Sequence, residues 1–95
     1  MEHITIAGNV EVPAFLALQQ LGFQLERRVH ANEQEFWIAT KSDISFSATS
    51  TLELLGLCLM RSTRGAEWKA SNEEIDDYLR TYYPRALPGG DDTEA

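Results

Sequence analysis

Apolar residues along the first part of the chain follow two different periods. At residues 3–6 every second residue is apolar, which predicts a short strand ending before Gly8. From residue 10 to residue 22 the spacing becomes helical, with Pro13 suited to the first turn of the helix and Gly22 to its end. Four residues form the predicted inward face of this helix: Val12, Phe15, Leu18 and Leu21.

The next part of the chain alternates between polar and apolar side chains with period two. This alternation predicts three strands, at residues 23–29, 35–40 and 43–48. Short polar turns, HANEQE and KSD, join them, so we expect an antiparallel meander with one packed face and one exposed face. Trp37 falls on the opposite strand face from Phe36 and Ile38. The alternation leaves open whether Trp37 lies under a helix or is exposed on the sheet.

A helix that is apolar nearly all round follows the strands. Ser50 and Glu53 have the spacing of a capping box, and Gly65 predicts the end of the helix. Its apolar residues point in almost every direction: Leu52, Leu54, Leu55, Leu57, Cys58, Leu59 and Met60. One sheet covers only one side of such a helix, so a second surface must cover another side.

A second capping box, from Ser71 to Glu74, begins the last helix, which ends before Pro84. Its apolar stripe consists of Ile75, Tyr78, Leu79 and Tyr82. We expect this stripe to cover the preceding helix, and the alternatives are self-association of two chains or a groove for a foreign partner. The sequence therefore predicts a single α+β domain over residues 1–87, in the order β-α-β-β-β-α-α. The antiparallel sheet would have about four strands with helices packed on one face, followed by a disordered acidic tail at residues 88–95.

Composition limits the class of protein further. A chain of 95 residues, 43% of them apolar, makes one domain with a core of its own. No stretch approaches the roughly 18 apolar residues of a membrane span, and the start of the chain lacks the pattern of a secretory signal. Cys58 is the only cysteine, which excludes an internal disulfide and fits a reducing compartment. We therefore expect a cytoplasmic protein with no membrane partner.

Residues able to carry catalysis are few. Cys58 lies among leucines in mid-helix, where burial raises the pKa of a thiol and makes it inert. His3 and His30 lie on the polar side of their predicted strands, and neither has a second ligand at metal-binding spacing. The sequence predicts no catalytic residue, cofactor or metal site, and hence a protein that is not an enzyme.

Acidic residues dominate the charge, with a net charge of −7. Because a negative surface repels phosphate, nucleic acid is not expected as a partner, and a basic protein is the better match. The predicted partner-binding residues are the densest acidic block with two aromatic residues: Glu67, Glu73, Glu74, Asp76, Asp77, Tyr83 and Trp37. The alternative is an ordinary solvated helix face, in which acids stabilise the first turn and Asp76 pairs with Arg80.

The segments EFWIA, ISFSATSTLELLGLCLM and RGAEW, between residues 35 and 68, carry a resemblance. Their order resembles that of small acidic bacterial proteins, several of them similar to immunity proteins of polymorphic and contact-dependent toxin systems. The resemblance implies a cytoplasmic, non-enzymatic protein that binds and blocks a toxin domain encoded nearby. It implies no particular binding residue. A homodimeric protein, similar to secretion chaperones that dimerise through an apolar helix, is the alternative.

Overall fold

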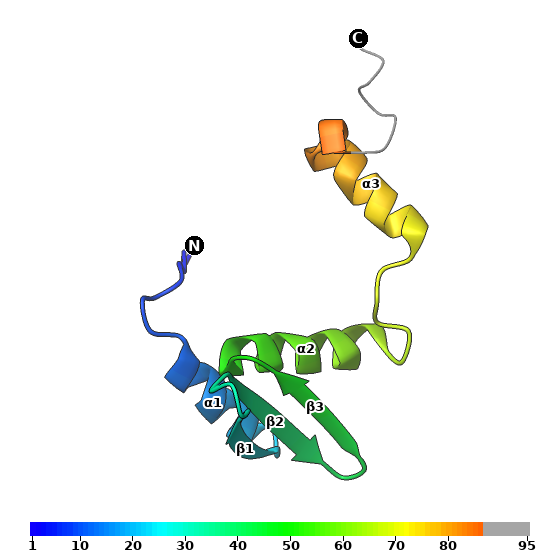
Figure 1. Cartoon of the computed structure of the whole chain (residues 1–95). Helices are drawn as coiled ribbons and strands as arrows, with labels where there is room; N and C mark the ends of the chain where they lie inside the picture. The colour runs from blue at the N-terminus through cyan, green and yellow to red at the C-terminus, as the bar shows by residue number, and fades with distance from the viewer. Residues whose placement is uncertain (87–95) are drawn as a thin grey trace. The chain divides into compact units, whose positions relative to one another are not determined.

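The computed structural model describes residues 1–86, so the tail predicted at residues 88–95 lies outside the described residues. The chain divides after Gly65 into two units, and each is described by itself. The first unit contains, in chain order, α1 (Glu11–Gln20), β1 (Gln24–Val29), β2 (Glu35–Lys41), β3 (Ile44–Ala48) and α2 (Thr51–Arg64) (Figure 1). The second unit contains α3 (Asn72–Tyr82) and the 3-10 turn η1 (Pro84–Ala86). The single domain over residues 1–87, and the packing of the last helix on the preceding one, stay predictions.

The three predicted strands of the meander are confirmed as one antiparallel sheet with the order β1-β2-β3. Leu25 lies opposite Ala39, and Ala39 lies opposite Phe46, so these three side chains share one face of the sheet. The short turn between β2 and β3 is made possible by Ser42, whose φ of 56° lies in the left-handed region. The α+β class is therefore correct, with three strands in place of about four.

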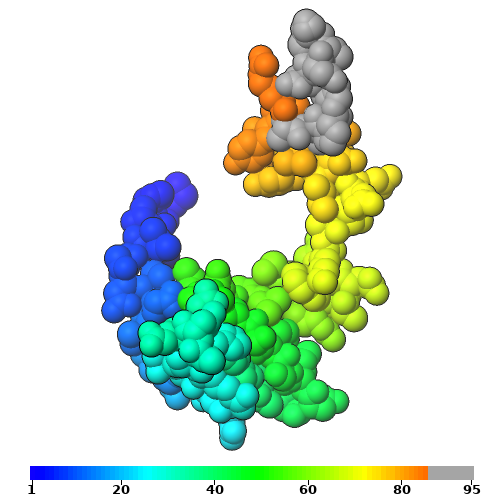
Figure 2. Space-filling model, in the orientation of Figure 1, coloured from blue at the N-terminus to red at the C-terminus, as the bar shows by residue number. Residues whose placement is uncertain are grey.

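The strand predicted at residues 3–6 is wrong. No strand in the described part of the chain includes these residues, and Ile4 and Ile6 are 78% and 76% exposed. Figure 2 shows the N-terminal residues, in dark blue, projecting away from the packed body of the first unit. An alternating segment forms a strand only when a neighbouring strand pairs with its backbone. The sheet offers no free strand beside residues 3–6.

The core of the first unit lies between the sheet and the two helices α1 and α2. Its buried cluster takes Leu18 from α1, Ala39 from β2, and Leu54 and Cys58 from α2. Six partly buried residues surround the cluster: Phe23, Leu25, Trp37, Phe46, Ala48 and Leu55. Both helices therefore cover the same face of the sheet, as the sequence predicts.

The inward face of α1 differs in part from the prediction. Leu18 is fully buried and Phe15 is partly buried, but Val12 and Leu21 are exposed. Ala14 is buried instead, one turn before Leu18. The helix ends at Gln20, so Leu21 lies beyond its last regular turn.

The N-terminus of α2 is fixed by two sets of polar contacts. Ser50 accepts a hydrogen bond from the Glu53 backbone N–H at 3.1 Å, as the capping pattern predicts, while the Glu53 carboxylate accepts from the backbone N–H of Thr49 instead of Ser50. The buried Thr51 links α2 to α1, because its backbone N–H donates to Glu11 Oε1 at 2.9 Å. The Thr51 hydroxyl oxygen also lies 2.7 Å from both Oε1 and the carbonyl oxygen of Glu11.

This link predicts a specific loss of stability in acid. Hydrogen bonds from Thr51 hold the pKa of the Glu11 carboxyl below its ordinary value of 4.5. The unfolded chain therefore takes up this proton at a higher pH than the folded chain. The stabilisation is present above the unfolded value and is lost as the pH falls through the lower folded pKa. We expect Glu11→Gln to be less stable than the wild type at pH 7 and to lose less stability between pH 6 and pH 3.

Urea unfolding at a series of pH values, followed by circular dichroism, measures this difference. Glu2→Gln is the matched control, because Glu2 is an exposed carboxylate with no hydrogen-bond partner among residues 1–86. The same acid dependence in Glu11→Gln and wild type would contradict the assigned role of the Glu11 carboxylate.

Candidate functional site

Helix α3 presents the most pronounced separation of charged and apolar residues in the described chain. The predicted capping box is present in full: the Ser71 backbone N–H donates to Glu74 Oε1 at 2.8 Å, and Ser71 Oγ accepts from the Glu74 backbone N–H at 3.1 Å. At about 100° per residue, Ile75, Tyr78, Leu79 and Tyr82 fall on one side of the helix. No residue of α3 is buried, so nothing within its own unit covers this apolar stripe.

Acidic side chains occupy the opposite side of α3. Glu73, Asp76 and Asp77 cluster there, and Glu74 lies at its border beside the capping Ser71. Arg80 Nη1 pairs with Asp77 Oδ1 at 2.8 Å, which corrects the predicted pairing of Arg80 with Asp76. The side chains of Glu73 and Asp76 have no hydrogen-bond or ion-pair partner within residues 1–86, although Glu73 lies in the first turn of α3, where a negative charge stabilises the helix.

Three tyrosines gather at the C-terminal end of α3. The ring centroid of Tyr78 lies 5.5 Å from that of Tyr82 and 6.0 Å from that of Tyr83. Their side chains are 57%, 68% and 55% exposed, respectively. Sequence reasoning selected Tyr83 for binding but assigned Tyr78 and Tyr82 to internal packing. Their spacing alone could not separate the two roles, because an apolar stripe at i and i+4 serves a core and an interface equally well.

The predicted partner-binding residues do not all belong to one unit. The acidic residues and Tyr83 lie in the second unit, where Glu67 is exposed in the connector before α3. Trp37 lies in the first unit, on the sheet face that the helices cover. Its ring meets the ring of Phe15 edge-on at 5.9 Å, and its Nε1 donates to Glu35 Oε2 at 3.0 Å. Trp37 is therefore a partly buried packing residue of the first unit.

The environment of Glu35 explains how Trp37 is held at the edge of the core. The Trp37 indole and the Arg27 guanidinium both donate to this carboxylate, and together they lower the pKa of Glu35. Arg27 is the one charged residue in the apolar phase of β1, and its contact with Glu35 at 2.9 Å gives it a partner at the sheet surface.

The candidate catalytic residues lie apart from one another. Burial raises the pKa of the Cys58 thiol, as its position among leucines predicts. His30 stacks on Phe36 with 4.4 Å between ring centroids, on the sheet face opposite the helices, and His3 lies in the N-terminal segment before α1. Among residues 1–86, no group of three His, Cys, Asp or Glu side chains is placed to hold a metal ion.

Comparison with known protein families, with curated proteins and with solved structures finds no match for this chain. Within the described residues, every helix is too short or too polar to span a lipid bilayer. The surfaces of the chain are therefore the guide to its function, and α3 has the most distinctive of them.

Proposed function

We propose that this protein is a non-enzymatic protein-binding module, an immunity-type inhibitor that binds a basic toxin or effector domain in the cytoplasm. The proposal rests on one observation: within its own unit, α3 exposes an apolar stripe of Ile75, Tyr78, Leu79 and Tyr82 on one side and its acidic residues on the opposite side. The resemblance of residues 35–68 to small acidic immunity-type proteins agrees with it. The inhibitor acts through its surface, without a cofactor or a metal ion.

The length of α3 explains why this stripe needs a covering surface. An isolated helix shorter than roughly 12–15 residues is marginally stable in water, and α3 has 11 residues with none of them buried. Its capping box stabilises the first turn but leaves the apolar side chains in contact with water. An amphipathic helix with anchors at i, i+3, i+4 and i+7 is a common ligand for an apolar groove. Tyrosine is also among the residues that most often dominate binding energy.

Charge defines the kind of partner that α3 fits. The acidic face would attract a basic surface over a distance of about one Debye length, which raises the association rate. A toxin domain that acts on nucleic acid has a basic active site for phosphate groups. The carboxylates of Glu73 and Asp76 would take the place of those phosphates, while the tyrosines on the other side of α3 would pack against an adjoining apolar surface of the partner. Occlusion of the active site is the resulting mechanism of inhibition.

The candidate partner is the product of the neighbouring reading frame, where that frame encodes a toxin-like or secreted protein. Purified product of that frame is titrated with the wild-type chain and with the double variant Tyr78→Ala/Tyr82→Ala by calorimetry. We expect the double variant to bind at least 100-fold more weakly, since each buried tyrosine anchor contributes about 2 kcal/mol or more.

Phe36→Ala, on the sheet face away from the helices, is the matched control for loss of an aromatic ring and should keep the wild-type affinity. Both variants are also unfolded thermally without partner. Unchanged affinity of the tyrosine variant would contradict the proposal. A large drop in its melting temperature would do the same, because the stripe would then serve the fold of the chain itself.

The alternative function, a homodimeric chaperone-like or structural protein, is favoured by the outer face of α2. Leu52, Leu59 and Met60 are 40–47% exposed there, and a Cβ atom added at Gly56 would meet nothing within 4 Å. A second copy could therefore approach the α2 backbone closely. Analytical ultracentrifugation at micromolar concentration separates the two functions, since a strict monomer of 10.7 kDa contradicts the dimer.

A further inference from the structure

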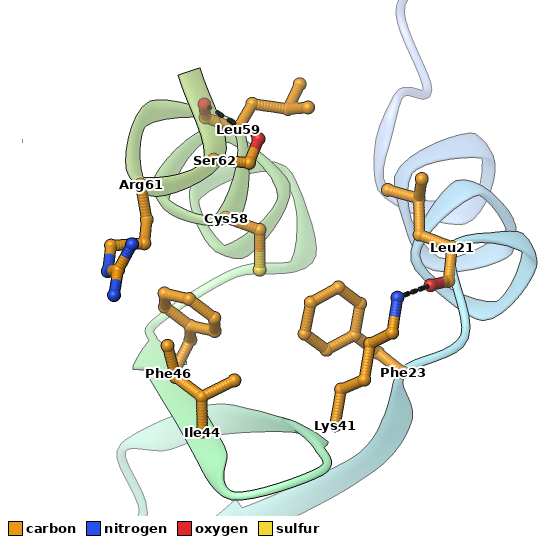
Figure 3. Close-up of a pocket in the computed structure, with 9 residues that line it drawn as sticks. All are labelled: Leu21, Phe23, Lys41, Ile44, Phe46, Cys58, Leu59, Arg61 and Ser62. Carbon is orange, nitrogen blue, oxygen red and sulfur yellow. Dashed lines mark hydrogen bonds between the residues drawn. The ribbon is translucent and has the colours of Figure 1, made fainter. Parts of the chain in front are cut away.

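A cavity of about 290 Å³ opens at one end of the first unit, away from Trp37 (Figure 3). It lies between the end of α1, the start of β1, the turn between β2 and β3, and the second half of α2. All of its lining residues belong to the first unit, so a ligand could bind here whether or not α3 has the function proposed above.

The inner wall of the cavity is apolar. Phe23, just before β1, and Phe46 from β3 meet edge-on with 5.9 Å between ring centroids. Figure 3 shows the Cys58 sulfur pointing into the space between these two rings, with Ile44 beside Phe46. A cavity of this kind favours the apolar part of a ligand, because water inside it has few polar groups to bond.

Two cations stand at the rim of the cavity. Lys41 Nζ donates to the carbonyl oxygen of Leu21 at 2.7 Å and lies 5.5 Å from the centre of the Phe23 ring, so its position is fixed. Arg61 is partly buried on α2. Its backbone carbonyl oxygen accepts from the Gly65 N–H at 2.8 Å, but its guanidinium makes no hydrogen bond or ion pair within the described residues 1–86. Its guanidinium therefore retains all five N–H donors beside an apolar wall.

Two positively charged side chains beside an apolar wall are unusual in a chain with a net charge of −7. None of the nine residues that line the cavity is acidic, although acids outnumber bases in the sequence by 15 to 8. The lining residues are therefore positively charged where the chain as a whole is negative, and an anion would find donors at the rim, with Asp43 of the adjoining turn outside the lining.

From these observations we propose that the cavity binds a small amphipathic carboxylate, such as a medium-chain fatty acid. The apolar chain lies between Phe23, Phe46 and Cys58, and the carboxylate accepts hydrogen bonds from Arg61. The planar fork of a guanidinium matches a carboxylate with two parallel hydrogen bonds. Lys41 Nζ, which donates to the Leu21 carbonyl oxygen, adds a second positive charge on the opposite side of the cavity (Figure 3). The volume is at the lower end of the roughly 300–1,000 Å³ found for small-molecule sites, which suits a short or medium chain.

Octanoate, kept below its micelle-forming concentration, is the probe. It is titrated into ¹⁵N-labelled full-length protein, and amide shifts are followed by NMR. We expect saturable shifts centred on Phe23, Phe46 and Cys58. Octan-1-ol, which has the same chain without the charge, should bind at least tenfold more weakly.

Two arginine variants separate a specific carboxylate contact from a general charge effect. Arg61→Gln should weaken octanoate binding at least tenfold and leave the binding of octan-1-ol unchanged. Arg64→Gln removes the same charge from the same end of α2, but Arg64 does not line the cavity, so it should bind octanoate as the wild type does.

Three results would overturn the proposal. The first is the absence of saturable octanoate shifts in the wild-type protein, which does not depend on the folding of any variant. The second is an equal loss of octanoate affinity in both arginine variants, which would make the contact a general charge effect. The third is equal affinity for octanoate and octan-1-ol, which would remove the carboxylate from the site.

Discussion

Leu54→Ala is expected to lower the free energy of unfolding by about 2–5 kcal/mol. Leu54 is fully buried on α2, in the cluster that joins α1, the sheet and α2. Removing its side chain leaves a cavity that Leu18 and Ala39 cannot fill, because α1 and β2 hold these two residues in place. A small domain has only about 5–15 kcal/mol of stability in total, so this change would remove a large part of it.

Leu52→Ala is the matched control, on the same helix and with the same loss of atoms. Leu52 is 40% exposed and lies on the outer face of α2, so its replacement should cost less than about 1 kcal/mol. Urea unfolding monitored by tryptophan fluorescence and by circular dichroism measures both variants. Equal losses would contradict the described burial and would show that the outer face of α2 is covered in solution.

Reversal of the acidic face of α3 is expected to lower the association rate with a basic partner by at least tenfold at low salt. The variant is Glu73→Lys/Asp76→Lys, which leaves the Glu74 capping box and the Asp77–Arg80 pair intact. The physical reason is that complementary charge accelerates encounter, and the reversed charges would repel the same surface. The effect should shrink as salt rises, because exposed charges more than about 10 Å apart are screened at 0.1 M.

Stopped-flow measurement of the association rate at several salt concentrations tests this expectation. Glu2→Lys/Glu33→Lys is the control, since it gives the same net charge but changes exposed residues outside α3. If both variants slow association to the same extent, net charge governs the encounter and α3 has no special part in it. A variant that binds as fast as the wild type at low salt would remove Glu73 and Asp76 from the interface.

Local signals in the sequence predicted several elements correctly. The side chains that cap α2 and α3 are specified within three or four residues, so Ser50 and Ser71 could be identified without any knowledge of the fold. The antiparallel meander could also be predicted from the sequence, because the turns between its strands are short and each strand pairs with its neighbour in the chain. The burial of Cys58, which raises the pKa of its thiol, followed from the leucines around it.

The errors share a different physical cause. The segment at residues 3–6 alternates as a strand does, yet it has no neighbouring strand to bond with. Arg80 had two acids within reach on α3, and side-chain geometry selected Asp77 over Asp76. Trp37 could face either side of the sheet in the sequence, and its contact with Phe15 on α1 places it on the covered side.

The sequence by itself determined the local features of this protein: its three-stranded meander, its helix caps, its acidic character and the amphipathic form of α3. Each depends on interactions between residues that are close together in the chain. Only the tertiary structure decided which apolar residues are buried, that Glu11 joins α1 to α2 through Thr51, and that Arg61 faces an apolar cavity. These features depend on contacts between distant segments, and periodicity along the chain contains no information about which segments meet.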